Sequence, residues 1–327
     1  MAGVEIKKVE IDENGMRLDR WFKVHYPGLG FGYLQKLLRS GQIRVDGGRV
    51  KADMRLFLGQ TVRVPPLPVK DRESLLVTDK TLRGQDDATV LKKMLLYEDS
   101  KIFVFNKPAG LAVQGGSGLT RHVDSMLEVW RNKKGEKPRL VHRLDRETSG
   151  VLIVARSRGA AQALTAAFRT RETKKTYWAL VRGVPKKKQD KISTWIVKEN
   201  IAQGDKMRVC EHGEPNANHA VSYYRVLDTR GRALSWLEME PYTGRTHQLR
   251  VHAAYMDHPI IGDSKYFFSD SNWNLPGGIQ NRLHLHARRI RIPHPSGKIL
   301  DITAPLPPHM VQSFNLLAFN EIDGDTE

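Results

Sequence analysis

The stretch that decides the fold is residues 142–155, His-Arg-Leu-Asp-Arg-Glu-Thr-Ser-Gly-Val-Leu-Ile-Val-Ala. It opens with a polar segment and continues, after Ser149 and Gly150, into an apolar run rich in β-branched residues. Such a sequence is typical of a loop held at the start of a buried strand. We therefore expect the apolar run to lie inside a sheet and the polar loop to carry the candidate site.

Asp145 is the residue of this loop that is best suited to chemistry. In extended backbone, residues two apart point the same way, so Arg143 and Asp145 should share one face. A carboxylate between Arg143 and Arg146 stays ionised, because nearby positive charge favours the charged form. An ionised and well positioned Asp can act as a nucleophile or a base. In an arbitrary sequence, a surface ion-pair cluster would be the commoner explanation of this pattern.

The residues from His142 to Ser157 resemble the signature of the large-subunit ribosomal pseudouridine synthases, the family named for its A, C and D members. The Asn-Lys-Pro-x-Gly segment at 106–110 looks like the first motif of the same family. The block Thr-Gly-Arg-Thr-His-Gln at 243–248 looks like its third motif. The motifs occur in family order, and the resemblance covers nearly the whole chain.

The resemblance implies three catalytic residues, Asp145, Tyr177 and Arg245. Asp145 would be essential, either attacking the base or the sugar or abstracting a sugar proton. Tyr177 would stack on a uracil turned out of its helix and could assist removal of the proton from carbon five. Arg245 would partner the Asp145 carboxylate and hold it ionised.

The resemblance also implies contacts with the substrate. Arg143 would fill the gap that the target nucleotide leaves in its stack, and Leu249 would form an apolar wall of the pocket. Lys107 should shape the floor of the site rather than react. The full set of expected substrate-binding residues is Arg143, His142, Leu249, Asn106 and Lys107.

The fold that the resemblance implies is of the α+β class. It combines a small N-terminal α/β RNA-binding domain with a catalytic domain built on a mixed, mainly antiparallel sheet with flanking helices and a cleft, the pseudouridine synthase fold. The implied reaction breaks the bond from nitrogen one of uridine, rotates the uracil and joins carbon five to the ribose. No redox change or group donor is involved, so we expect no cofactor and no metal. The sequence has no Rossmann glycine fingerprint and no P-loop.

The sequence pattern of residues 1–65 predicts a compact unit. It should contain helices over about 16–22 and 33–39, strands over 43–45 and 60–64, and a hairpin turn at Asp46-Gly47-Gly48. This segment resembles the S-four-like RNA-binding domain. Its candidate phosphate contacts, which would add affinity without reading sequence, are Lys36, Arg39, Arg44 and Arg49. The alternative for each is a solvated helix or strand face.

The pattern divides the chain into four parts. The S-four-like domain covers residues 1–65, a Pro-rich and then mixed-charge linker covers 66–90, and the catalytic domain covers 91–317. An acidic tail covers residues 318–327, and its end from Glu321 to Glu327 should be frayed.

The formal net charge is +17, which favours a polyanionic partner and makes nucleic acid the leading candidate before an anionic membrane surface. There is no apolar run long enough to span a membrane and no secretory signal, so we expect a soluble, cytoplasmic monomer bound to 23S ribosomal RNA, free or in a partly assembled subunit. Cys210 is the only cysteine, which excludes an intrachain disulfide and a cysteine-built zinc site.

Histidines in the C-terminal half could suggest a metal site: His247, His252, His258, His284 and His286. They lack a nearby cysteine and a frame of paired carboxylates. We therefore expect polar supporting roles or RNA contacts, and no metal.

Other functions compete with this interpretation. A catalytically inactive RNA-binding or ribosome assembly factor would have no need of Asp145 among cations. A hydrolase with paired carboxylates would need a second acid, and Glu147 has no spacing that supports the pair. A pseudouridine synthase acting on transfer RNA is a further alternative. Within the ribosomal branch we favour the C-type over the D-type, although no residue discriminates between them.

Overall fold

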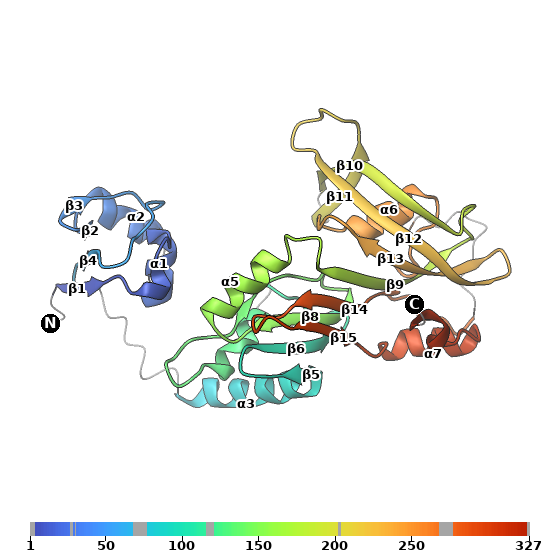
Figure 1. Cartoon of the computed structure of the whole chain (residues 1–327), viewed down its shortest axis with the longest axis horizontal. Coiled ribbons are helices and arrows are strands. Elements are labelled where there is room, and N and C mark those ends of the chain that lie inside the picture. Colours follow the sequence, from blue (N-terminus) through green and yellow to red (C-terminus); the bar gives the residue numbers. More distant parts are fainter. Residues whose placement is uncertain are drawn as a thin grey trace. The chain divides into compact units, whose positions relative to one another are not determined.

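The computed structural model in Figure 1 describes residues 4–26, 29, 31–67, 77–115, 121–201, 204–267 and 277–325. The chain divides into two compact units, Met1–Thr81 and Leu82–Glu327. Each unit has its own sheet and its own hydrophobic core.

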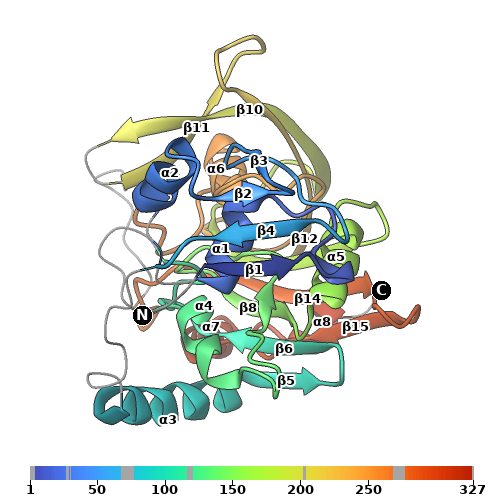
Figure 2. The ribbon, with the colours of Figure 1, turned by 90° about the vertical axis from the view of Figure 1, so that its left-hand side faces the viewer.

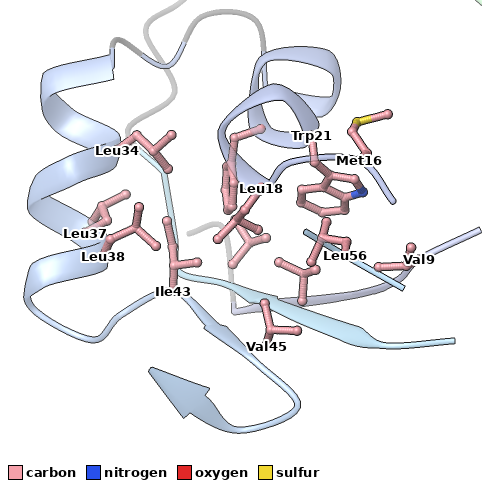
Figure 3. Packing of buried hydrophobic residues seen from close by; sticks show 13 residues of the cluster. Val9, Met16, Leu18, Trp21, Leu34, Leu37, Leu38, Ile43, Val45 and Leu56 are labelled. Atoms are coloured by element: carbon pink, nitrogen blue, oxygen red, sulfur yellow. The ribbon is translucent and has the colours of Figure 1, made fainter. Parts of the chain in front are cut away.

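The first unit is a four-stranded antiparallel sheet in the order β1-β4-β2-β3, with two helices. Its elements are β1 (Glu5–Lys8), η1 (Ile11–Glu13), α1 (Leu18–His25), α2 (Phe31–Arg39), β2 (Arg44–Val45), β3 (Gly48–Arg49) and β4 (Thr61–Val64). Figure 3 shows Leu18, Trp21, Leu37 and Ile43 meeting in one apolar core. Both helices and the paired strands lie close to the ranges that the sequence predicts.

The hairpin turn of this unit has the backbone conformation that its sequence predicts. Asp46 and Gly47 both have positive φ, at 49° and 78°. A two-residue hairpin loop with positive φ at both positions matches the twist of the flanking strands. Asp46 also accepts hydrogen bonds from the backbone and hydroxyl of Thr61, which joins the turn to β4.

Half of the expected linker is helical. Residues 68–76 lie outside the described residues, but α3 (Val77–Met94) runs through most of the remainder. Leu91 and Met94 near its end are buried in the core of the second unit, and Figures 1 and 2 show α3 alongside β5 (Leu95–Glu98). This burial favours the helical conformation of a segment whose own sequence pattern is weak.

The second unit is built on an eleven-stranded sheet in the order β11-β10-β12-β13-β9-β14-β8-β6-β5, with β15 paired to β14 and β7 to β8. Figure 2 shows β5 and the β10–β11 hairpin at opposite ends. The strands after β5 are β6 (Ile102–Lys107), β7 (Arg139–Leu140), β8 (Ser149–Ala155), β9 (Lys174–Arg182), β10 (Gln189–Ile201), β11 (Gly204–Cys210), β12 (Asn218–Arg230), β13 (Leu234–Pro241), β14 (Leu285–Pro293) and β15 (Ile299–Thr303). Among the described strands only β14 and β8 pair in parallel, so the sheet is mixed and mainly antiparallel, as expected.

The helices of this unit are α4 (Val123–Met126), η2 (Leu127–Trp130), α5 (Arg158–Ala167), α6 (Gln248–Tyr255), α7 (Pro308–Leu316) and α8 (Glu321–Asp325). Helix α6 packs on the strands of the β10–β11 end, with Val251 buried against Ile196 and Met207. Helix α4 passes directly into the 3-10 turn η2, so it is only four residues long.

Strand β8 lies inside the sheet between β14 and β6, and all seven of its residues are buried. Its start is fixed by Gly150, which has φ +111° and lies opposite Ala287 of β14. A Cβ at this glycine would lie 2.2 Å from the carbonyl oxygen of Ala287, so any side chain would force the two strands apart. The Ser-Gly pair therefore anchors the end of the polar loop to the sheet.

The C-terminal segment is anchored rather than frayed as far as Asp325, while residues 326–327 lie outside the described part. Arg288 is only 6% exposed, and its guanidinium forms ion pairs with Glu321 at 3.2 Å and Asp325 at 2.5 Å. A buried guanidinium needs such anionic partners. Gly324 packs so tightly against the side chains of Trp236 and Trp178 that a Cβ would clash with both.

Candidate active site

A pocket of about 330 Å³ lies beside the polar loop. Its walls come from that loop, from β9, from the turn that follows β13 and from the first turn of α6. It brings together six of the eight residues expected to act in catalysis or to bind substrate: Asp145, Tyr177, Arg245, Arg143, His142 and Leu249. Asn106 and Lys107 are not among the lining residues.

The carboxylate of Asp145 is accessible from the pocket, with 20% of its side chain exposed. Its nearest cationic groups are Nη1 of Arg250 at 3.7 Å and Nε2 of His247 at 3.9 Å, both beyond hydrogen-bonding distance. Within the described part of the chain, no donor forms a hydrogen bond with this carboxylate. Its lone pairs are thus available to react.

The structure places Arg250, and not Arg245, beside Asp145. Arg250 lies in α6 with 5% of its side chain exposed, and it donates two hydrogen bonds to Asp263, at 2.8 and 2.7 Å. Burial disfavours the charge of Arg250, but the hydrogen bonds to Asp263 and the charges of Asp263 and Asp145 outweigh it and raise the pKa of the guanidinium. Arg245 is exposed at the pocket wall, and its Nε donates to the carbonyl of His219 at 3.2 Å.

Tyr177 faces the pocket from β9, while Trp178 points to the opposite side and is fully buried, as the alternation of a strand predicts. Burial, together with the charge of Asp145, raises the pKa of the Tyr177 hydroxyl. This hydroxyl therefore stays protonated near neutral pH, so that it can donate a hydrogen bond but is a poor base. Its half-buried ring remains available for stacking.

The comparison with known proteins assigns this chain to a family. The sequence model described as RNA pseudouridylate synthase matches residues 101–255, which include Asp145, Tyr177 and Arg250. The ribosomal large subunit pseudouridine synthase C of Yersinia pestis is 36% identical over 93% of this chain and 92% of its own length. The chain belongs to the RNA pseudouridylate synthase family. The protein of the same description from Escherichia coli K12 is also 36% identical, over 93% of each chain.

Solved structures of RNA pseudouridylate synthases share the fold. Human RNA pseudouridylate synthase domain containing 4 has a TM-score of 0.60 at 30% identity, covering 73% of this chain and 98% of its own. Human RNA pseudouridylate synthase domain containing 1 has a TM-score of 0.53 at 26% identity, covering 71% and 94%. The expected fold class is thereby confirmed.

In this pseudouridylate synthase, His142 supports the catalytic loop. Its Nε2 accepts a hydrogen bond from the backbone N–H of Ile153 at 2.8 Å, and its ring stacks on Phe168 at 4.5 Å. Burial, and to a lesser extent the charge of Lys175, lowers the pKa of His142 to about 3, so the imidazole is neutral. The ring thus fastens the loop to β8, although one side of it also borders the pocket.

Lys175 is a pocket residue that the sequence analysis missed. It lies two residues before Tyr177 on β9, so the alternation of the strand turns both side chains toward the pocket. Within the described residues its ammonium has no hydrogen-bond or ion-pair partner, and burial lowers its pKa. The two-residue alternation of side chains along the strand was the sequence signal that could have identified Lys175.

Lys107 and Asn106 support the site from outside the pocket. The side chain of Lys107 is fully buried, and its Nζ lies 2.9, 2.8 and 3.1 Å from the carbonyl oxygens of Pro108, Leu111 and Arg146, so that an ammonium can donate to all three and a neutral amine to two. It therefore ties the loop after β6 to the loop that carries Asp145. Asn106 donates to the carbonyl of Pro305 at 2.9 Å. Neither residue lines the pocket, and their expected contact with substrate stays a prediction.

The turn before α6 is organised by Gln248. The side-chain oxygen of Gln248 accepts hydrogen bonds from the hydroxyl of Thr243 at 2.6 Å and from the backbone of Arg245 at 3.1 Å. Thr246 does not cap the helix. The residue at the cap position is His247, which has a left-handed backbone with φ 54° and no capping side-chain hydrogen bond.

Of the four basic residues expected to contact RNA in the first unit, three are exposed and one is held by hydrogen bonds to the backbone. Lys36, Arg39 and Arg49 are exposed. Arg44 instead donates to the carbonyls of Gly41 at 3.1 Å and Gly47 at 3.0 Å, which makes it part of the hairpin. We therefore expect phosphate contacts from the three exposed residues first.

The remaining histidines have structural partners. His252 bonds to Thr194 and Ser222, His258 to the carbonyl of Arg182, His284 to Ser313, and His286 to Ser149. In the described ranges, no cluster of His, Cys, Asp and Glu has an arrangement suited to a metal ion. Burial raises the pKa of the Cys210 thiol, which leaves it unactivated. The described helices include none long and apolar enough to cross a membrane.

Proposed function

We propose that this protein converts uridine to pseudouridine in the RNA of the large ribosomal subunit, working as a monomer in the cytoplasm. The observation that carries the proposal is the carboxylate of Asp145, which borders the pocket without a hydrogen bond from any described residue and with Arg250 at 3.7 Å. A carboxylate in this state can attack the substrate or take a proton from its sugar. The names of the relatives support ribosomal RNA as the substrate.

The other pocket residues suit a uridine turned out of its stack. Tyr177 offers a ring for the uracil, and Leu249 offers an apolar wall on the side of α6. Arg143 is exposed at the pocket, where it can occupy the space that the base leaves in the RNA. Lys175 adds a positive charge for a phosphate or for a carbonyl of the base.

The reaction keeps every atom of the substrate except for an exchange of protons. The glycosidic bond to nitrogen one breaks, the uracil rotates while Tyr177 and Leu249 retain it, and carbon five bonds to the ribose. Carbon five then loses its proton, and nitrogen one, released from the ribose, takes up a proton. Because the protonated Tyr177 is a poor base, we assign that step to Asp145 or to solvent. An isomerisation of this kind changes no oxidation state and takes no group from a donor, so the proposal includes no cofactor.

Mapping pseudouridines in cells that lack the gene tests the proposal. Specific pseudouridines should disappear from large-subunit ribosomal RNA and return when the wild-type gene is restored. Loss of pseudouridines from transfer RNA alone would favour the alternative substrate. Unchanged pseudouridine in every RNA, with a defect in subunit assembly, would favour an RNA-binding factor without catalysis.

A further inference from the structure

His247 lies between Asp145 and a second buried side chain, Tyr266. Its Nε2 is 3.9 Å from Oδ2 of Asp145, and its Nδ1 is 2.8 Å from the hydroxyl of Tyr266. The His247 side chain is 10% exposed, and Tyr266 is 3% exposed. Both therefore belong to the interior wall of the site and not to its surface.

The hydrogen bonds of Tyr266 fix the tautomer of His247. The hydroxyl oxygen of Tyr266 accepts a hydrogen bond from the backbone N–H of Met207 at 2.8 Å. Burial raises the pKa of Tyr266 to about 12, so the hydroxyl keeps its own hydrogen, which needs an acceptor. Among the described residues, Nδ1 of His247 is the acceptor within reach. Nδ1 must then be unprotonated, and the hydrogen of the neutral imidazole lies on Nε2.

We propose that His247 is a positioning residue for Asp145: Tyr266 holds it as the Nε2–H tautomer, and that N–H restrains Oδ2 of Asp145 so that Oδ1 faces the reacting atoms. The inference rests on the proposed function. In the free protein the gap of 3.9 Å is too long for a hydrogen bond. Catalytic hydrogen bonds are often long in free enzymes and shorten when substrate is bound. We therefore expect the distance between Nε2 of His247 and Oδ2 of Asp145 to shorten when RNA binds.

Two further observations favour this role. His247 has a left-handed backbone with φ 54°, a conformation that only a few per cent of non-glycine residues adopt and that clusters at functional sites. Tyr266 also stacks under the other neighbour of Asp145, because the guanidinium of Arg250 lies 5.1 Å from the centre of its ring. One tyrosine thus supports both groups that flank the carboxylate.

His247 and Arg250 act differently on the carboxylate. Burial lowers the pKa of His247, opposed by the charge of Asp145 and reinforced by those of Arg250 and Lys265. The imidazole is therefore a neutral donor near pH 7, whereas Arg250 carries a full charge. A neutral donor can hold the orientation of Asp145 with less loss of its nucleophilicity than a second cation would cause.

The tautomer can be measured without any activity. Long-range proton–nitrogen NMR correlations of the histidine-labelled whole protein distinguish the two tautomers, and His247→Gln identifies the signal that belongs to His247. We expect the Nε2–H form in the wild type and a mixture of tautomers in Tyr266→Phe. An Nδ1–H form in the wild type would overturn the inference.

A matched pair of variants tests the donor itself. The amide nitrogen of Gln at 247 can reach the position of Nε2, whereas that of Asn reaches only the position of Nδ1. Asn tolerates the left-handed backbone better than most residues, so His247→Asn should fold, which its melting temperature will check.

The single-turnover rate on saturating RNA should fall about 10- to 100-fold in His247→Asn, the usual effect of losing a hydrogen bond to a charged group. It should fall much less in His247→Gln, and RNA affinity should stay within a few-fold in both. Equal rates in the two variants, whether high or low, would overturn the donor role. A wild-type protein that forms no pseudouridine would instead contradict the proposed function, while the NMR result would stand independently.

Discussion

Nη1 of Arg250 lies 3.7 Å from Oδ2 of Asp145 while the rest of the same guanidinium is fixed in the interior. Two hydrogen bonds to Asp263, a fully buried carboxylate, set the position and the plane of the Arg250 side chain. The positive charge beside Asp145 is thus held in place before any RNA arrives. Such preorganised charge is the usual source of electrostatic catalysis.

Replacing Arg250 should damage both stability and turnover. Arg250→Met leaves Asp263 buried without a cation, which typically costs about 3–5 kcal/mol of unfolding free energy. It also removes the charge beside Asp145, so turnover should nearly cease. Arg245→Met is the matched control, because Arg245 is exposed, and its unfolding free energy should change by less than about 0.5 kcal/mol. Urea unfolding and single-turnover assays measure both effects, and equal stability of the two variants would count against the assignment.

Tyr177 should separate stacking from hydroxyl chemistry. Tyr177→Phe keeps the ring, so RNA affinity should change little while the rate falls, because the hydroxyl donor is lost. Tyr177→Ala should in addition lose about 1–3 kcal/mol of binding free energy, the usual contribution of a stacked base. Filter binding and single-turnover rates measure the two effects. A fully active Phe variant would leave only the stacking role.

Lys107 should make stability depend on pH above neutrality. Burial lowers its pKa from 10.5 to about 7, partly opposed by the charges of Glu147 and Asp145. Between these two values the unfolded chain binds the proton and the folded protein does not, so folding becomes more favourable as the pH rises through this window. The unfolding free energy of the wild type relative to Lys107→Met should therefore increase from pH 7 upward. A difference that stays constant across the window would mean that the buried amine keeps its ordinary pKa.

The first unit should contribute affinity and salt dependence rather than chemistry. Of its four candidate phosphate contacts, Lys36, Arg39 and Arg49 are exposed, while Arg44 is engaged with the hairpin backbone. Replacing each exposed cation with Gln in the full-length protein should reduce the log-log salt slope of RNA binding by roughly 0.7–0.9 per phosphate contact. The rate at saturating RNA should change little. Slopes identical to that of the wild type would show that these residues do not hold RNA.

Local patterns were sufficient to predict much of the fold and part of the site. The apolar run after Gly150 is a buried interior strand of the sheet, and the alternation of β9 separates Tyr177 from Trp178. The Asp46-Gly47 turn also follows from local backbone chemistry. Each of these features depends on residues within a few positions of one another.

The features that the sequence could not supply depend on long-range contacts. Arg250 approaches Asp145 because His247 adopts a left-handed backbone and α6 begins only at Gln248, and no local signal sets that helix phase. Lys107 follows an apolar strand, yet its inward direction depends on a carbonyl at Arg146. The anchored C-terminal segment likewise depends on a pairing between distant parts of the chain.

The most direct test of the account is to treat unmodified large-subunit ribosomal RNA with the purified protein and with Asp145→Asn, and to count pseudouridines at each uridine. The wild type should convert specific uridines with no added cofactor. Asp145→Asn should convert none while binding the RNA within a few-fold of the wild type, because Asp145 contributes no attraction to phosphate. Pseudouridine formation by Asp145→Asn at the wild-type rate would contradict the account.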